Sequence, residues 1–492
     1  MGKRSLNEQW NPAVLTTAEP PNRRFAVICL VVYCAVTLFV ALHHEPWRDE
    51  ADAWLVVRDM PLRNMIPHWT SNAGTPALWY LLLKPLALAG LPYMSEELLH
   101  VTLACIAAAV FLWRAPFTRL TKILLLASYP ILYEYAIVAR SYVLTVLLLW
   151  IAAALHRERE RRPLLYALAI ALLFNTNVHG AVIAATLVLL YILQSRRDWR
   201  ALLIMVFGAA LALWQLWPRL DAAYPQVVRE YRPKAVFWAI TGMYLPDQFL
   251  DDWTITVFVP QWTTTLWLAL SIGLLTFLLI TLRKHRDSLV LLLVPYVALL
   301  CLFVAVWYGG ARHAGLLLVL IIATLWIAGP LPRTQESAAT AGFLNIALAA
   351  SAFAGGIPMT VVDILEPMTM SRAIAEDLIA NDLVQFPIAC DAPYACEAIL
   401  PYLDKKQFFY PAISRDGTYM TWDRSEWKAQ DPGLRTIFAR IRARFGPQGW
   451  ILITNETVGD PAPWGLRLWY KADEPARYLD EHYWLYTPVR SK

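Results

Sequence analysis

The chain has 492 residues, of which 58% are hydrophobic and 16% are charged, and its mean hydropathy is +0.43. Soluble globular domains average about 45–50% apolar and about 25% charged residues, so this composition excludes an ordinary soluble domain. The net charge of +5 is modest, and no nucleic-acid-binding pattern accompanies it. The composition therefore predicts a multi-pass membrane protein.

The apolar residues are gathered into runs along the chain. A run of about 17–25 residues is long enough to cross a bilayer as a helix. Several runs are shorter, which indicates tilted or broken helices where backbone lines a cavity. In chain order the runs cover about 25–42, 76–91, 98–113, 122–139, 141–155, 164–175, 178–194, 200–217, 263–282, 288–307, 313–331 and 340–360.

Basic loops orient these runs, because Lys and Arg are enriched in cytoplasmic loops. Basic residues precede the first run and recur at 156–163, 195–200 and 283–286. Residues 1–24 are polar and are followed by no clear cleavage site, so we expect them to form a cytoplasmic tail rather than a cleaved signal peptide.

The run 76–91 contains Lys84 and is bounded by turn residues. We interpret it as a re-entrant or juxtamembrane helix, which leaves about eleven spans in a transmembrane module over 25–360. In the alternative interpretation the run 76–91 is itself a span. The expected number of spans therefore lies between about 11 and 13.

Three polar segments are then expected on the outer side of the membrane: 43–97, 219–262 and the tail 361–492. The tail mixes helix-like and strand-like stretches and is long enough for its own core, which predicts a small extracytoplasmic α/β domain. Cys390 and Cys396 lie close together in this tail. These two cysteines either form a disulfide or remain free thiols, and the sequence leaves both possibilities open.

The first outer segment begins with an unusual density of charge in "WRDEADAW", which starts at Trp47 and includes Asp49 and Glu50. A solvated loop would explain it, but the flanking tryptophans favour a position at the membrane interface. A carboxylate there is suited to act as a general base. His68 and Asn72 follow in the same segment and are candidate pocket residues.

Further polar residues stand at the ends of later runs. Arg140 is a candidate phosphate ligand, since a guanidinium suits phosphate oxygens, or else a structural partner of Glu134. Asn177 and His179 are candidates for pocket lining. Tyr308 is a further candidate for pocket lining. Arg312 and His313, which follow it, are candidate phosphate ligands, or else residues that snorkel to the membrane interface.

These stretches resemble the GT-C superfamily of integral-membrane glycosyltransferases, in particular its protein mannosyltransferase and aminoarabinose transferase branch. The resemblance rests on "WRDEADAW", "GTPALWYLLLKP" and "ARSYVL". It implies a GT-C-like helical fold, Asp49 as catalytic base with Glu50 beside it, and a donor phosphate near Arg140, Arg312 and His313.

The resemblance further implies an inverting transfer of a hexose or pentose from a polyprenyl-phosphate donor to a lipid, glycan or protein of the cell envelope. It places the protein in a bacterial inner membrane, with membrane lipids and the sugar donor as partners. It implies no cofactor besides the lipid-linked donor, and no metal. Two alternatives stay open: a lipid-carrier-dependent ligase or polymerase of the O-antigen type, and a transporter or flippase.

Overall fold

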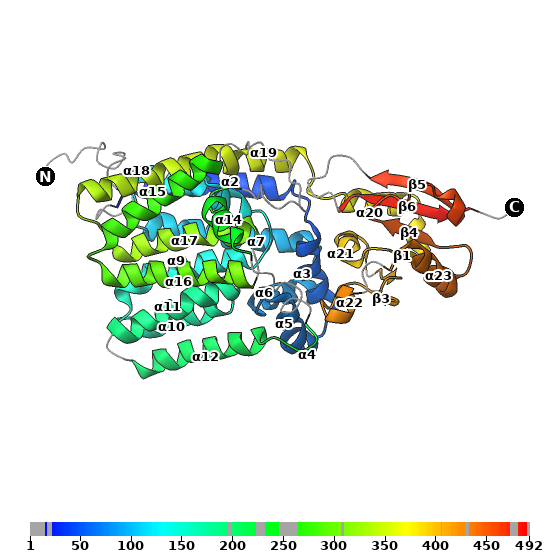
Figure 1. Cartoon of the computed structure of the whole chain (residues 1–492), viewed down its shortest axis with the longest axis horizontal. Helices are drawn as coiled ribbons and strands as arrows, with labels where there is room; N and C mark the ends of the chain where they lie inside the picture. The colour runs from blue at the N-terminus through cyan, green and yellow to red at the C-terminus, as the bar shows by residue number, and fades with distance from the viewer. Residues whose placement is uncertain are drawn as a thin grey trace.

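The computed structural model describes residues 15–16, 22–194, 198–222, 232–245, 264–306, 309–404, 406–428, 432–472 and 481–489. Figure 1 shows a helical bundle joined at one end to a smaller domain that contains all the labelled strands. The helices α3 to α6 lie between the two parts (Figure 1).

The helices of the bundle run from α2 to α19. Their bounds are α2 Arg23–Ala41, α3 Arg48–Asp59, α4 Leu62–Asn64, α5 Thr70–Ala73, α6 Leu78–Leu88, α7 Met94–Arg114, α8 Arg119–Ala127, α9 Tyr142–Leu155, α10 Pro163–Phe174, α11 Val178–Gln194, α12 Trp199–Leu216, α14 Lys234–Gly242, α15 Thr264–Leu282, α16 Arg286–Ala305, α17 Ala311–Ala328, α18 Gln335–Ser351 and α19 Ile357–Leu365. Wider π-helical turns, η1 Met65–Trp69, η2 Pro130–Glu134 and η5 Ala352–Gly356, and a 3-10 turn, η3 His156–Glu158, interrupt the series.

Within the described residues, seven helices are long and apolar enough to cross a membrane. Shorter apolar helices accompany them: α6, α10 and α11. The expectation of a mostly helical multi-pass membrane protein is thereby confirmed, whereas the number of about eleven spans stays a prediction. Large apolar side chains such as Phe207 and Leu193 are 69% and 68% exposed, as befits helices that face lipid.

The helix α17 lies at the centre of the bundle. The membrane-length window of this helix is 83% buried, the highest share among the seven candidate spans. It packs against α9, α14 and α16, so the residues at its start are held by neighbours on several sides.

The C-terminal domain is built on a six-stranded mixed sheet with strand order β3-β2-β1-β4-β6-β5. The strand β1 pairs in parallel with β2 and β4, and the other pairs are antiparallel. The strands are β1 Ile388–Cys390, β2 Phe408–Tyr410, β3 Arg415–Gly417, β4 Ile451–Thr454, β5 Leu466–Ala472 and β6 Tyr483–Pro488. The helices and turns are α20 Ser371–Ala380, η6 Leu383–Gln385, α21 Pro393–Cys396, η7 Glu397–Tyr402, α22 Arg424–Lys428, α23 Leu434–Phe445 and η8 Ala462–Trp464.

Both faces of this sheet are covered, which explains why its central strands β1 and β4 are buried at every position. Ile388 of β1 packs in the core that includes α20, while the next residue, Ala389, packs in the core that includes α23. This alternation follows from the two-residue period of a strand. The small α/β domain predicted for the tail is therefore present, and Cys390 and Cys396 are joined by a disulfide.

The helix α3 belongs to both parts of the molecule. Leu55 of α3 is fully buried in the same core as Ile374 and Ile388 of the C-terminal domain, while its neighbour Val56 packs in the core of the bundle. The helix α3 thus joins the C-terminal domain to the bundle.

Candidate active site

The candidate site begins with α3, which takes up most of "WRDEADAW". Its start is capped because the carboxylate of Glu50 accepts the backbone N–H of Trp47 at 3.2 Å, the N-terminal half of a capping box. Acidic residues fill its first turn and Arg58 its last turn, which suits the dipole of a helix. What looked like a charged loop is an ordered helix.

Consecutive residues on this helix point in different directions, so Asp49 and Glu50 have different surroundings. Glu50 is fully buried. Its carboxylate accepts the backbone N–H of Ala139 and lies 3.2 Å from Nε2 of His44. Glu50 therefore anchors α3 to the segment before α9, and its position is unsuited to contact with a substrate.

Asp49 instead lies between two arginines from distant parts of the chain. Its Oδ2 is 3.2 Å from Nη1 of Arg140 and 3.1 Å from Nη2 of Arg312. Arg140 also donates to the backbone carbonyl of Asp49 at 2.6 Å. The three side chains are 22–24% exposed, so the cluster remains open to a ligand.

The charge of Asp49 follows from this pairing. Burial by itself would raise the pKa of the Asp49 carboxyl, but neighbouring guanidinium groups, above all Arg140 and Arg312, hold that pKa below its ordinary value. Asp49 is accordingly an ionised carboxylate at neutral pH.

Arg312 is positioned by the start of α17. His313 accepts the backbone N–H of Gly310 through Nδ1 at 2.8 Å, and its Nε2 lies 2.8 Å from the hydroxyl of Tyr142. The guanidinium of Arg312 also lies over the ring of Trp47, 5.1 Å from its centroid, a cation–π geometry. His313 thus acts on this site by holding the helix end that carries Arg312.

The remaining candidate site residues of the bundle are His179, Asn177 and Tyr308. The ring of His179 is 4.9 Å from that of His313. Asn177 donates to Thr145 at 2.8 Å and accepts the N–H of Gly180 at 2.8 Å, so its side chain caps the start of α11. Tyr308 lies outside the described residues.

Arg140 and Glu134 use different partners in this structure. Arg140 pairs with Asp49, whereas Glu134 accepts a hydrogen bond from the hydroxyl of Tyr129. The structural alternative of a Glu134–Arg140 pair is therefore not the arrangement that the structure adopts.

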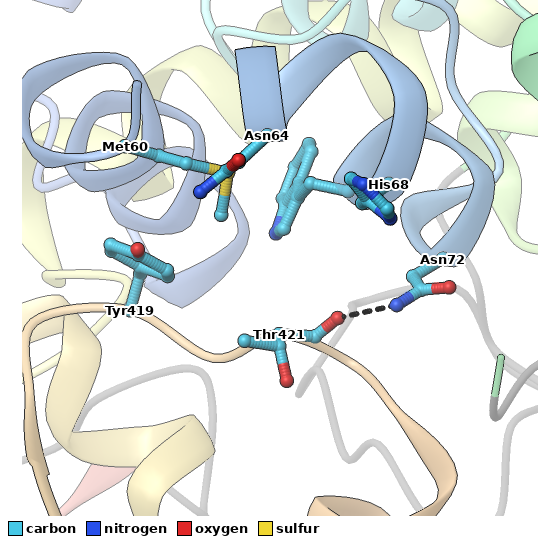
Figure 2. Close-up of a pocket in the computed structure, with 7 residues that line it drawn as sticks. Met60, Asn64, His68, Asn72, Tyr419 and Thr421 are labelled. Atoms are coloured by element: carbon cyan, nitrogen blue, oxygen red, sulfur yellow. Dashed lines mark hydrogen bonds between the residues drawn. The ribbon is translucent and has the colours of Figure 1, made fainter. Parts of the chain in front are cut away.

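A separate cavity lies where residues 60–72 meet the C-terminal domain (Figure 2). It has a volume of about 320 Å³ and is lined by Met60, Asn64, His68, Trp69, Asn72, Tyr419 and Thr421. Asn72 donates to the backbone carbonyl of Thr421 at 2.9 Å, and Trp69 donates to that of Met420 at 3.2 Å (Figure 2 draws the first bond). The predicted pocket residues His68 and Asn72 therefore share one pocket, to which the tail contributes Tyr419 and Thr421.

Asp52 interacts both with the arginine cluster and with Trp422, which follows the cavity-lining Thr421 in the chain. It is placed one helical turn after Asp49, and its Oδ2 accepts the indole N–H of Trp422 at 3.3 Å. Burial, followed by the nearby Asp49 carboxylate, raises the pKa of Asp52 to about 8. The spacing of three residues within "WRDEADAW" places Asp52 on the face of Asp49, but no local signal in the tail pointed to Trp422.

Arg48 holds the C-terminal domain against this site. Its backbone N–H faces the carboxylate of Glu481 at 3.3 and 3.4 Å. Its guanidinium lies between aromatic rings, 5.6 Å from the centroid of Trp47 and 5.1 Å from that of Tyr394. The buried side chain of Trp47 is therefore a support for two arginines.

No family model matches the chain, and no curated protein matches it. Among solved structures, ArnT from Cupriavidus metallidurans bound to undecaprenyl phosphate is similar with a TM-score of 0.49 and 13% identity, over 94% of this chain and 98% of that chain. The arabinofuranosyltransferase AftD from Mycobacteria is similar with a TM-score of 0.37 and 17% identity, over 97% of this chain and 41% of that chain.

Both relatives are of the kind that the sequence motifs resemble. Because both TM-scores lie below 0.5, neither likeness by itself defines the activity of this chain. A functional assignment has to rest on the geometry of the site.

Proposed function

We propose that this protein is a membrane glycosyltransferase that moves a sugar from a polyprenyl-phosphate donor to an acceptor of the cell envelope. The observation that carries the proposal is the placement of Asp49 between Arg140 and Arg312. Two guanidinium groups held around one oxyanion, partly open to solvent, form a site suited to a phosphate.

In this proposal the donor phosphate binds to the arginines that now pair with Asp49. When the bond between the anomeric carbon and the phosphate oxygen breaks, the oxygen leaves with the electron pair. The positive charge of Arg140 and Arg312 stabilises the charge that develops there. The arginines are fixed before the reaction by α17 and by the backbone of Asp49, so they need little rearrangement.

Asp49 is the proposed general base. An acceptor hydroxyl attacks the anomeric carbon from the face opposite to the phosphate and transfers its proton to the Asp49 carboxylate. A phosphate that engages Arg140 and Arg312 removes part of the cationic compensation of Asp49, which makes that carboxylate a stronger proton acceptor. Attack from the opposite face would invert the anomeric configuration.

The acceptor is proposed to enter through the cavity between His68, Asn72 and Thr421. The cavity-lining Thr421 precedes Trp422, whose indole N–H donates to Asp52. A polar acceptor bound there is proposed to extend past this segment toward the arginine cluster. Its lining of amide, imidazole and aromatic groups is typical of sites that hold sugars or other polar acceptors.

The proposed topology follows the expectation from the basic loops: tail 1–24 in the cytoplasm, module 25–360 in a bacterial inner membrane, and domain 361–492 outside. In this orientation the site lies at the outer surface, where a lipid-borne donor meets a polar acceptor. Cysteine accessibility labelling in intact cells at exposed Asp460 and at exposed Arg161, each changed to Cys, tests this orientation.

The decisive experiment compares Asp49→Asn with Asp59→Asn, a control on the same helix whose carboxylate pairs with Arg58 at 2.9 Å. Lipid-linked saccharides are extracted from a deletion strain complemented with each variant and are measured by mass spectrometry. We expect the donor lipid to accumulate with Asp49→Asn and not with Asp59→Asn.

The same assay separates the alternative functions. A ligase of lipid-linked glycans would tolerate Asp49→Asn and fail with Arg312→Ala, while a transporter would move its substrate without forming a new glycosidic bond. Normal transfer by Asp49→Asn, with wild-type amounts of folded protein, would contradict the assignment of Asp49 as base.

A further inference from the structure

A second cluster of ionisable side chains lies behind the arginine site. His44 follows α2, Glu50 belongs to α3, and Glu97 belongs to the first turn of α7. Their exposures are 0%, 0% and 1%. One ligand atom from each, an imidazole nitrogen and two carboxylate oxygens, lies within 4.8 Å of both others.

The orientation of His44 is set by an acidic partner on its far side. Its Nδ1 lies 2.8 Å from Oδ2 of Asp363, and the other oxygen of Asp363 accepts the hydroxyl of Tyr133 at 2.8 Å. A carboxylate is an acceptor, so Nδ1 carries the proton and the lone pair of neutral His44 is on Nε2. This arrangement of carboxylate and imidazole is the usual second layer of a metal-binding histidine.

The lone pair on Nε2 faces another acceptor. Nε2 is 3.2 Å from Oε2 of Glu50, and two acceptors at that distance repel unless a cation or a proton lies between them. Zn²⁺ binds imidazole nitrogen and carboxylate oxygen at about 2.0–2.2 Å, so two of its tetrahedral ligands stand roughly 3.3 Å apart. The separation of His44 and Glu50 fits that spacing.

Glu97 supplies an independent observation. Both of its carboxylate oxygens are buried without a hydrogen-bond partner. An isolated buried carboxylate is costly, and buried charges are normally paired or coordinate metals. A divalent cation would satisfy Glu97 and balance the two carboxylates of the cluster.

We propose that His44, Glu50 and Glu97 bind one divalent transition-metal ion of the zinc type, through Nε2 of His44 and one oxygen of each carboxylate, with Asp363 orienting the imidazole. The ion ties the end of α2, the start of α3 and the start of α7 together. Because Glu50 directly follows Asp49 on α3, the ion also fixes the helix that presents Asp49.

The competing explanation keeps the cluster free of metal, with protons in place of the cation. His44 would then be an imidazolium between Asp363 and Glu50, and Glu97 would be a neutral acid. The two explanations differ in metal content and in the response of stability to added metal, and neither measurement depends on the glycosyltransferase activity proposed above.

The first test measures metal in the full-length protein. The chain is purified in detergent without metal-affinity resin, and its metal content is determined by inductively coupled plasma mass spectrometry. We expect about one equivalent of a transition metal per chain, and a lower thermal unfolding temperature after treatment with a chelator that added Zn²⁺ restores and Mg²⁺ does not.

Variants locate the ion. Glu97→Gln keeps the shape of the side chain and removes its charge, so we expect it to lose the metal and its response to chelator. Asp363→Asn leaves the three ligands in place and should weaken metal affinity about 10–100-fold. The matched control is Glu96→Gln: Glu96 is also fully buried, and both its carboxylate oxygens lack a hydrogen-bond partner, but it lies outside the cluster, so it should keep the metal.

Three outcomes would overturn the proposal. They are a wild-type protein with no bound metal and no thermal response to Zn²⁺, equal metal content in Glu97→Gln and wild type, and a restoration by Mg²⁺ that Zn²⁺ does not match. If Glu97→Gln does not fold, the chelator response of the wild type and the affinity of Asp363→Asn decide the question.

Discussion

The carboxylate of Asp49 lies 3.1 Å from the guanidinium of Arg312, although the two residues belong to α3 and to α17, the most buried of the candidate spans in the described residues. This contact brings a carboxylate and a guanidinium suited to bind an anion into one place. It also makes the role of each residue measurable by substitution.

Arg312→Ala is expected to lower kcat/KM for the lipid-linked donor by about 10²–10³-fold, because in the proposed mechanism it removes one of two preorganised donors to the leaving phosphate. Arg312→Lys should recover only part of this loss, since an ammonium lacks the planar fork of guanidinium. Transfer assays with a radiolabelled polyprenyl-phosphate sugar measure both. The control is Arg283→Ala, an exposed arginine that faces Glu336 at 3.7 Å, and an equal loss in that variant would contradict a specific role for Arg312.

His68→Ala is expected to raise the apparent KM for the acceptor by about tenfold, a cost of about 1.4 kcal/mol in binding, while leaving the KM for the donor unchanged. The reason is that His68 lines the cavity next to Asn72 and away from the arginines. Steady-state kinetics with each substrate varied in turn measures the split. His43→Ala is the matched control, because His43 is exposed and bonds only locally to the carbonyl of Phe39; a change confined to the donor KM of His68→Ala would place the acceptor elsewhere.

Leu55→Ala is expected to destabilise the contact between α3 and the C-terminal domain by about 2–5 kcal/mol, the range for truncating a fully buried leucine. Limited proteolysis should then release the domain at a lower protease concentration than in the wild type. Leu62→Ala serves as the control because Leu62 is 41% exposed. Equal protease resistance of Leu55→Ala and wild type would show that α3 is not what holds the domain.

The stability of the C-terminal domain is expected to depend on pH through Asp391. Burial raises the pKa of Asp391 to about 7, against the opposing effect of backbone N–H groups such as that of Ala392. The unfolded chain has a pKa of about 3.9 at this residue. The folded state therefore holds the proton more tightly, and its stability is lost progressively as the pH rises from about 4 to about 7.

Asp391→Asn mimics the protonated acid, so this part of the pH dependence should disappear in the variant. Thermal unfolding at pH 5, 6.5 and 8 is expected to show a wild-type midpoint that falls relative to that of Asp391→Asn as the pH rises. The exposed Asp460→Asn should follow the wild type. A constant difference between wild type and Asp391→Asn across this range would refute a raised pKa.

Local patterns in the sequence were enough to predict the class of fold and several residues of the candidate site. The apolar runs predicted helices such as α15 and α17 nearly to their ends, because a membrane span needs only length and hydropathy. The strand-like stretch of the tail at Ile451 to Thr454 is indeed a strand. Asp49 and Arg140 stood out because charge at the end of an apolar run is costly and hence conspicuous.

The tertiary structure decided how those residues are used. Asp49 and Glu50 are adjacent and chemically alike, yet the direction of each on α3 places one between two arginines and the other in a buried anchor with His44. The wall of the cavity formed by Tyr419 and Thr421 comes from the tail and carries no local motif. Such convergence depends on how distant segments pack around α17 and α3, and the periodicity of a single segment holds no information about its partners.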